Sequence, residues 1–242
     1  MVKLSIIIPT LNEEEYLERL LKSIKKQDFK EYEIIVSDSK SEDNTIKVAK
    51  KYGAKIVIGE KKGPGHGRNM GVKKSKGKYL LFIDADVILP DKKTFTKAIK
   101  ALKNETFAGG VAISYGCDGN FIHNLMVTVG LKFYESLVKL NIPIAPGFFM
   151  FTRKELFEKV GGFDEELPVG EDLKFLKSIC SYGKPKLLNC KIKISSRRLS
   201  EGGLLKTIKD YFPTTIAYFL NEDYSKKNFK FEAASEIKNK KR

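Results

Sequence analysis

Two aspartates, Asp84 and Asp86, stand one residue apart directly after the apolar segment 79–83. If that segment is a strand, the alternation of its side chains points both carboxylates the same way. Carboxylate oxygens suit Mg²⁺ and Mn²⁺, which proteins hold through one or two carboxylates together with the phosphates of a substrate. The pair therefore favours a divalent-metal site, although such a pair on its own also occurs at ordinary turns.

Polar side chains also follow three other apolar segments. In chain order these groups are Pro9-Thr10-Leu11-Asn12-Glu13 after residues 4–8, Ser37-Asp38-Ser39 after residues 33–36, and Gly63-Pro64-Gly65-His66-Gly67-Arg68-Asn69 after residues 55–58. Ligands of open α/β sheets bind beyond the carboxyl ends of the strands, so we expect these groups to share one ligand site. No Gly-x-Gly-x-x-Gly follows the first segment, which argues against a dinucleotide-binding fold.

The elements that must position these residues alternate along the first half of the chain. Short β-branched and aliphatic segments predict strands, and apolar residues at helical spacing, such as Leu17, Leu20, Leu21 and Ile24, predict the helices between them. The predicted strands are 4–8, 33–36, 55–58 and 79–83, and the predicted helices are 13–26, 43–51 and 64–75. This order predicts an α/β fold with a doubly wound, mainly parallel sheet flanked by helices.

The second half of the chain is less regular. Strands are predicted at 109–114, 148–152 and 191–195, and helices at 120–140, 171–181 and 203–220. Glu171 and Asp172 open one of these helices, where carboxylates favour the positive end of the helix dipole. No internal repeat and no Pro- or Ser-rich linker divides the chain. We therefore expect one domain over residues 1–224 and a basic tail over 225–242.

The formal net charge of the 242-residue chain is +15, and nearly all of it is local. Residues 50–78 contain ten Lys or Arg and one Glu, and residues 225–242 contain seven Lys or Arg and two Glu. A groove for single-stranded nucleic acid would interleave basic residues with aromatic ones, whereas 50–78 contains only Tyr52. We therefore do not expect nucleic acid as a partner. The apolar share of 42% excludes general disorder.

Neither the cysteines nor the apolar segments indicate a secreted or membrane-spanning chain. Three cysteines show no zinc-ligand spacing, the N-terminus lacks a signal-peptide pattern, and no segment reaches about 18 uncharged apolar residues. We expect a cytoplasmic protein. Residues 121–140 and 203–220 each predict an amphipathic helix, which fits either core packing or peripheral contact with the inner face of a membrane.

Four groups of residues occur in a distinctive order. They are Ser5-Ile6-Ile7-Ile8-Pro9-Thr10-Leu11-Asn12-Glu13; Ile35-Val36-Ser37-Asp38-Ser39-Lys40-Ser41-Glu42-Asp43-Asn44-Thr45; Gly67-Arg68-Asn69-Met70-Gly71 with Gly77-Lys78-Tyr79 and Asp84-Ala85-Asp86; and Gly161-Gly162-Phe163-Asp164-Glu165 with Glu171-Asp172. Over most of residues 3–200 the chain thus resembles glycosyltransferase family 2, whose members have the GT-A fold and use nucleotide sugars. The resemblance implies a nucleotide-sugar-binding half over 1–115 and an acceptor-binding half over 116–224.

The resemblance also implies roles for single residues. Those implied to bind the nucleotide sugar are Pro9, Thr10, Asn12, Glu13, Asp38, Arg68, Asp84, Ala85, Arg197 and Arg198. Within this set Asp38 would accept a hydrogen bond from the base, and Arg197 and Arg198 would bind the diphosphate. Asp86, with Asp84, would hold Mg²⁺ or Mn²⁺ on the diphosphate. Asp172 would be the general base, with Glu171 beside it.

By this resemblance the chain moves one sugar, with inversion, from a UDP- or GDP-linked donor to a glycan hydroxyl or a polyprenyl-phosphate-type acceptor. Ser39 and Lys40 stand where the family has the second Asp and the Gly of that block, while Asp38, to which the resemblance assigns base recognition, is retained. The chain has no Trp and hence no Gln-x-x-Arg-Trp of processive synthases, which predicts single transfer. Two other interpretations stay open: a nucleotidyltransferase, and a non-catalytic protein that binds an anionic polymer or a membrane.

Overall fold

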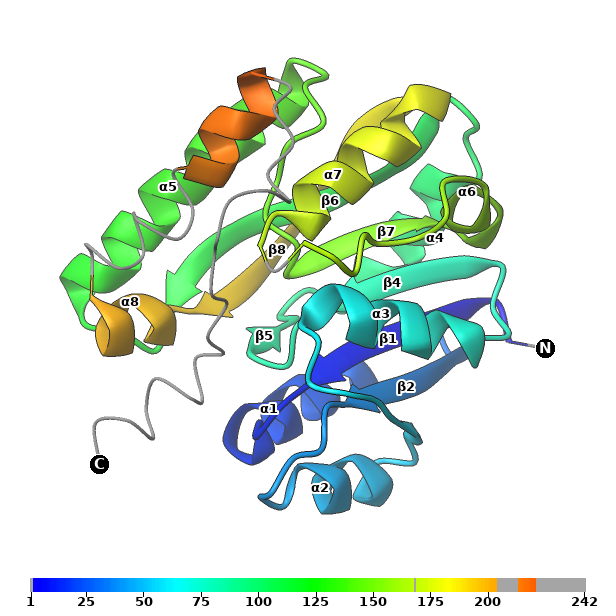
Figure 1. The fold of residues 1–242 in the computed structure, drawn as a ribbon, viewed down its shortest axis with the longest axis vertical. Helices are drawn as coiled ribbons and strands as arrows, with labels where there is room; N and C mark the ends of the chain where they lie inside the picture. The colour runs from blue at the N-terminus through cyan, green and yellow to red at the C-terminus, as the bar shows by residue number, and fades with distance from the viewer. Residues whose placement is uncertain (1, 168, 204–212, 221–242) are drawn as a thin grey trace.

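Residues 2–167, 169–203 and 213–220 are described by the computed structural model, and within them eight strands form one sheet (Figure 1). The sheet order is β3-β2-β1-β4-β7-β6-β8-β5. The strands are β1 (Leu4–Thr10), β2 (Tyr32–Asp38), β3 (Lys55–Ile58), β4 (Tyr79–Ile83), β5 (Val87–Ile88), β6 (Phe107–Cys117), β7 (Phe149–Arg153) and β8 (Lys184–Ser195).

Most of the sheet is parallel. β3, β2, β1 and β4 pair in parallel, and β6 pairs in parallel with β8. β7 lies antiparallel between β4 and β6, and the short β5 lies antiparallel on β8. The prediction of a doubly wound, mainly parallel α/β sheet is therefore confirmed. The carboxyl ends of β1, β2, β4 and β6 consequently meet at one edge, and the reversed β7 begins at that edge.

Helices cover both faces of the sheet. They are α1 (Glu14–Lys25), α2 (Thr45–Lys51), α3 (Pro64–Lys73), α4 (Thr94–Leu102), α5 (Phe121–Lys139), α6 (Lys154–Lys159), α7 (Glu171–Ile179) and α8 (Arg197–Gly202). One apolar core holds residues of α1, α2 and α4, and a second core on the opposite face holds residues of α3, α6 and α7. Residues 213–220 form a further helical segment beside α5 (Figure 1).

The alternation of β1 explains how one strand serves both cores. Ile6 and Ile8 pack into the first core and Ile7 into the second, and all three are fully buried. On the second face α3 lies so close to β1 that a Cβ atom on Gly71 would stand 2.5 Å from Ile7 Cγ2. The glycine thus brings the helix that carries Arg68 against the strand that carries Thr10.

Most predicted elements occur, with four additions. Strands 55–58 and 79–83 have the predicted bounds, and α5 differs by one residue at each end from 120–140. α4, α6, α8 and β5 were not predicted from the sequence, and only the last part of β8 was predicted. The predicted helix 203–220 is wrong at its start, because Gly203 with φ 82° ends α8. Residues 204–212 and the basic tail 225–242 lie outside the described residues.

Candidate active site

The ends of β1 and β2 form one hydrogen-bonded group. Their register places Thr10 opposite Asp38, and the Thr10 hydroxyl donates to Asp38 Oδ2 over 2.8 Å. The Ser41 amide and hydroxyl donate to the same carboxylate over 2.8 and 2.6 Å, and Asp38 is fully buried. Lys40 has φ 62°, a conformation that glycine adopts more readily, so this loop has the turn that a glycine would favour. Asp38 is therefore fixed by the protein's own donors.

Asn12 and Glu13 extend this group toward α2. The backbone N–H of Asn12 donates to Ser41 Oγ over 2.8 Å. The side-chain oxygen of Asn12 accepts from the backbone N–H of Glu42, also over 2.8 Å. The Glu13 amide donates to Thr45 Oγ1 over 2.7 Å. The loop after β1 is thereby held to the loop after β2, and Pro9 lies half-buried just before it.

Arg68 bridges the two halves of the chain from α3. Its Nη1 donates to Glu171 Oε1 over 2.7 Å, and its Nη2 donates to Asp84 Oδ1 over 2.9 Å. Nη2 also donates to the Gly147 carbonyl over 3.3 Å, and the guanidinium lies 5.2 Å from the centre of the Phe163 ring. The side chain is 2% exposed. Arg68 therefore joins acids that are far apart in sequence within a water-poor environment.

Glu171 and Asp172 begin α7 beside this arginine. The Gly147 amide donates to Asp172 Oδ2 over 2.6 Å, and the Leu173 amide donates to Asp172 Oδ1 over 2.8 Å. Burial, and next the charge of Asp172, raise the pKa of Glu171 to about 7, against the opposing effect of Arg68. Burial likewise raises the pKa of Asp172. Two adjacent carboxyl groups with raised pKa values suit proton transfer near neutral pH.

Arg197 forms a second bridge, from α8. Its Nε donates to Asp86 Oδ2 over 3.0 Å, its Nη2 donates to Glu13 Oε1 over 2.7 Å, and its guanidinium lies 4.2 Å from the centre of the Tyr16 ring. Burial raises the pKa of Glu13 to about 7, and the charges of Asp86 and Asp84 add to the shift. Glu13 Oε2 is buried and has no hydrogen-bond partner among the described residues. A buried, unpaired acceptor of this kind is where a ligand donor can bind.

The Asp84–Asp86 pair lies in a turn and not within a strand. β4 ends at Ile83, and the Val87 amide donates to the Asp84 carbonyl over 3.2 Å, so strand alternation does not set the two side chains. Each carboxylate has one oxygen bound to an arginine, and no described residue donates a hydrogen bond to the other. Burial raises the pKa of Asp84, partly offset by Arg68.

The carboxylates of Asp84 and Asp86 suit a metal ion whose remaining ligands come from a substrate. Among residues 2–167, 169–203 and 213–220 no three His, Cys, Asp or Glu side chains gather into a complete cation site. Two carboxylates that each retain an oxygen to which no described residue donates do suit Mg²⁺ or Mn²⁺, because these ions keep positions for water and phosphate oxygens.

Three residues that the sequence analysis did not assign shape the site. Gly147 supplies a backbone N–H to Asp172 and a carbonyl to Arg68, while Phe163 and Tyr16 lie under the two guanidinium groups. The Asn69 side chain fixes the turn that carries Phe163, since it donates to the Phe163 carbonyl and accepts from the Phe163 amide. A Pro-Gly pair at 146–147 signals a turn, but nothing in the sequence identifies a backbone amide as a carboxylate donor.

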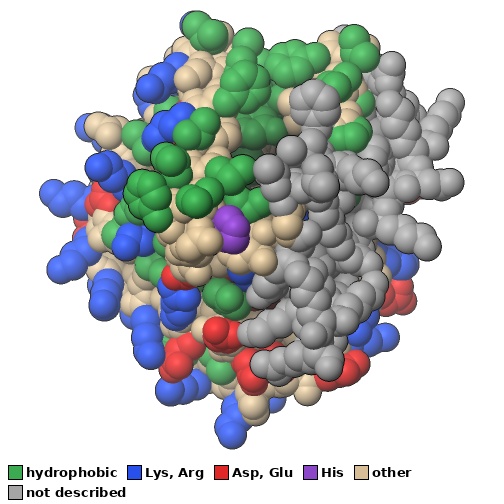
Figure 2. Space-filling view, turned by 90° about the vertical axis from the view of Figure 1, so that its left-hand side faces the viewer, with side chains coloured by type: hydrophobic (Ala, Val, Ile, Leu, Met, Phe, Trp, Pro, Cys, Tyr) green, Lys and Arg blue, Asp and Glu red, His purple; other side chains and the backbone are tan. Residues whose placement is uncertain are grey.

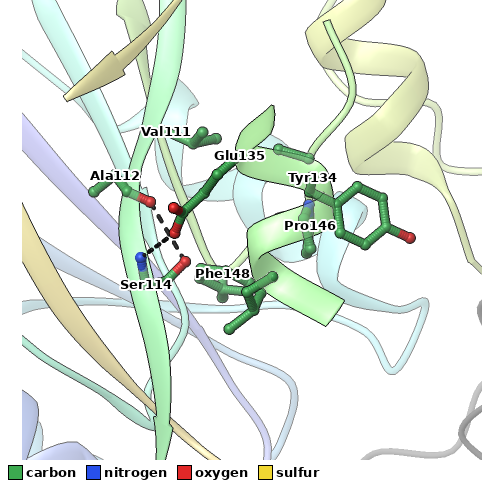
Figure 3. A pocket seen from close by; sticks show the side chains of 9 residues that line it. Val111, Ala112, Ser114, Tyr134, Glu135, Pro146 and Phe148 are labelled. Atoms are coloured by element: carbon green, nitrogen blue, oxygen red, sulfur yellow. Dashed lines mark hydrogen bonds between the residues drawn. The ribbon is translucent and has the colours of Figure 1, made fainter. Parts of the chain in front are cut away.

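The remaining predicted residues lie nearby with less defined contacts. Ala85 is 3% exposed and belongs to the first core. Arg198 is half-buried next to Arg197 in α8. A small hollow between β6 and α5 holds none of the site residues: Figure 3 shows Glu135 there, accepting from the Ser114 amide over 2.8 Å.

No helix within the described part of the chain is both long and apolar enough to cross a membrane.

The chain matches the family model described as Glycosyl transferase family 2 over residues 5–161, more than half of its length. It is 39% identical over 94 residues to poly(ribitol-phosphate) β-N-acetylglucosaminyltransferase TarS of Staphylococcus aureus, covering 36% of this chain and 16% of TarS. It is 26% identical over 190 residues to glycosyltransferase AglE of Haloferax volcanii, covering 74% of this chain and 62% of AglE. The chain thus spans less than two thirds of either relative.

Solved structures show the same fold. A crystal structure of Staphylococcus aureus TarS has a TM-score of 0.67 at 23% identity, covering 93% of this chain and 73% of that one. Mannosyltransferase PcManGT from Pyrobaculum calidifontis, solved with GDP-Man and Mn²⁺, has a TM-score of 0.70 at 20% identity, covering 97% and 67%. The expected GT-A-like fold is confirmed.

Proposed function

Because the chain belongs to glycosyltransferase family 2, we propose that it is an inverting transferase that moves a single sugar from a UDP- or GDP-linked donor to an acceptor hydroxyl or lipid phosphate. Solved relatives support a nucleotide-sugar donor: TarS structures hold UDP or UDP-GlcNAc, and PcManGT holds GDP-Man with Mn²⁺. The single domain over 1–224, with donor and acceptor halves, is part of the same proposal.

The donor-side residues would bind and orient the nucleotide sugar. Glu13, whose Oε2 has no partner within the described part of the chain, would accept from the nucleoside, and Arg197 would donate to the diphosphate. Asp86, with Asp84, would hold Mg²⁺ or Mn²⁺, which when bound offsets the charge on the leaving diphosphate. The buried Arg68 would keep Asp84 in place, because it already holds one of its oxygens.

On the acceptor side, Asp172 would receive the acceptor's proton. The acceptor oxygen forms a bond to the anomeric carbon as the bond from that carbon to the diphosphate oxygen breaks. The bonding electron pair leaves with the diphosphate, and the hydroxyl proton passes to Asp172. Two backbone N–H groups hold this carboxylate in one orientation. A phosphate acceptor is already an anion and would need no base.

The observation that carries the proposal is the pairing of Arg68. Glu171, 103 residues away, and Asp84 of the donor half meet on one buried guanidinium. This contact brings the metal-binding candidates and the base candidates to the same edge of the sheet. A protein that only bound an anionic surface would have no need for buried acids there, because acids oppose anion binding.

We expect Asp86→Asn to abolish the metal-dependent part of donor binding. A donor at about 100 times its Kd stabilises the protein by about 2.7 kcal/mol, which corresponds to a Tm increase of about 5–10 °C for a chain of this size. The measurement is thermal unfolding with UDP-glucose, UDP-GlcNAc and GDP-mannose, each with and without Mn²⁺. The wild type should respond to at least one donor, and the variant should lose the difference that Mn²⁺ makes.

Glu105→Gln is the matched control, because this exposed acid precedes β6 at the opposite edge of the sheet. It should keep the wild-type response. An Asp86→Asn variant with an undiminished Mn²⁺ effect would refute the metal assignment. A wild type that responds to no nucleotide sugar but binds anionic polymers with steep salt dependence would overturn the proposed function.

A further inference from the structure

The outward side of α5 is a stripe of large apolar side chains. Its inward side packs through Leu131, Glu135 and Val138. The outward residues, which we call the α5 stripe, are between 51% and 81% exposed: Phe121, Ile122, Leu125, Val129, Phe133 and Leu140. Most of them recur at intervals of four residues, so they lie along one side of the helix.

The helical segment 213–220 extends this apolar surface. Its Ala217 and Tyr218 face inward and pack near Tyr134 of α5, whose hydroxyl lies 2.8 Å from Thr215 Oγ1. Its other apolar residues, Ile216, Phe219 and Leu220, are exposed. Nine of the eleven exposed large apolar side chains in the described part of the chain thus lie on these two helices. Figure 2 shows hydrophobic side chains gathered over the upper part of one face, and such a gathering marks an interaction surface.

The charges beside the stripe select one class of partner. Lys132 and Lys139 of α5 are exposed, and the one acid of this helix, Glu135, is 6% exposed and pairs with Lys132, so these three side chains give α5 a net charge of +1 (two lysines less one acid). In a two-fold dimer the stripe would face its own copy, and lysines would approach lysines. An anionic bilayer offers apolar acyl chains for the stripe and negative headgroups for the lysines.

The stripe begins at the edge of the sheet where the site lies. Asn120 caps α5, accepting from the His123 amide over 2.8 Å. Asn124, in the first turn, accepts from the Ser196 hydroxyl over 2.9 Å, and Ser196 directly precedes Arg197. A surface that receives the α5 stripe therefore also lies close to Arg197.

We propose that the α5 stripe docks the protein on an anionic phospholipid bilayer, with α5 lying in the interface and the site edge at the level of the headgroups. The inference does not depend on the proposed transferase activity, because it rests on exposure and charge outside the site. It does give that activity a location, since an acceptor carried by a lipid would be presented at this edge.

The absence of tryptophan from the sequence allows a direct test. Phe133→Trp places a single indole in the stripe, and Tyr182→Trp places one at an exposed position in the segment after α7. On vesicles of phosphatidylglycerol and phosphatidylcholine, the first should shift its emission to shorter wavelength and be quenched by lipids brominated on the acyl chains. The second should do neither, and vesicles of phosphatidylcholine alone should have little effect on either.

A second pair of variants separates the stripe from other basic surfaces. The triple variant Leu125→Gln, Val129→Gln and Phe133→Gln should bind anionic vesicles at least about tenfold more weakly in co-sedimentation, with its thermal response to a nucleotide sugar unchanged. Ile58→Gln, which alters an exposed apolar residue on β3, should bind as the wild type does. Equal sedimentation of the triple variant would overturn the proposal. So would a wild-type dimer that the triple variant abolishes, because the stripe would then bind a second copy.

Discussion

Arg68 and Arg197 divide the acidic residues of the site between them. Arg68 pairs with Asp84 and Glu171, while Arg197 pairs with Asp86 and Glu13. Asp84 and Asp86 are thus held by different arginines although they are neighbours in sequence. Glu171 and Glu13 are buried, so removing the guanidinium that pairs with either one would leave that carboxylate uncompensated, which is far more costly than losing a surface pair.

At the scale of single residues, the raised pKa of Glu171 gives a pH-dependent stability. Its pKa is about 7 in the folded protein against 4.5 ordinarily, so between these values the folded state holds a proton that the unfolded chain releases. The stabilisation is complete below the lower value and is lost as the pH rises through the upper one. Glu171→Gln removes it. Between about pH 5 and pH 8 we expect the free energy of unfolding of the wild type to fall further than that of this variant. The difference between the two falls should be about 1–3 kcal/mol.

Urea unfolding at a series of pH values measures this difference. Glu158→Gln, a change at an exposed position of α6, should leave the pH dependence as in the wild type. Parallel pH profiles for the wild type and Glu171→Gln would show that Glu171 is ionised in the folded protein, in contradiction to the expectation.

That the candidate residues gather at one edge of the sheet could be predicted from the sequence, but their pairing could not. Polar residues after apolar segments pointed to Thr10, Asp38 and Asp84, and the order of the motifs added Arg68 and Glu171. The partners of Arg68 and Arg197 lie up to 184 residues away, and only the folded sheet determines which carboxylate each arginine reaches. Gly147 escaped prediction because its contribution comes from the backbone.

At the scale of elements, two glycines should respond in opposite ways to alanine. A Cβ on Gly110 would lie 1.8 Å from the Lys186 carbonyl oxygen of the neighbouring strand, so Gly110→Ala must push β6 and β8 apart. A Cβ on Gly130 of α5 meets nothing within 4 Å. We expect Gly110→Ala to destabilise by more than about 2 kcal/mol and Gly130→Ala to stabilise by about 0.5–1 kcal/mol, because alanine favours a helix interior.

Chemical denaturation of the two variants beside the wild type gives both values. Each variant serves as the control for the other, since both add the same methyl group. A Gly110→Ala variant as stable as the wild type would mean that β6 and β8 do not pair at this position.

Elements with a clear apolar period could be predicted, and elements without one could not. β3 and β4 are short, continuous apolar segments, and their bounds agree with the prediction. β8 begins with Lys184-Pro185-Lys186, which gives no strand signal, yet β6 pairs with it along that length. α8 is six residues long and charged, so it contains no apolar residues repeated at helical spacing from which a helix could be predicted.

At the scale of the whole molecule, the reversed strand ties the two halves into one sheet. β7 pairs with β4 and β6, which begin within residues 1–115, and β5 of the same residues pairs with β8. A fragment of residues 1–115 loses β7 and β8, so β4 and β6 lose partners. We expect this fragment to show no cooperative urea transition by circular dichroism, in contrast to the full chain.

The full chain under the same conditions is the reference for that experiment. A steep, single transition in the fragment would mean that residues 1–115 form an independent domain and that the single-domain proposal is wrong. The sequence predicted a mainly parallel sheet but not the direction of β7, because the side-chain pattern of a buried strand is the same in either direction.

The reversal of β7 also bears on how the molecule can change over generations. The chain leaves the sheet after β6 and returns to β7 at the same edge, and α5 lies within that excursion. A connecting segment of this kind can change in length or sequence without any change in the order of the strands. Residues 118–145 can therefore be remodelled while Asp84, Asp86 and Arg68 keep their places, because the contacts of Gly147 with Arg68 and Asp172 are left intact.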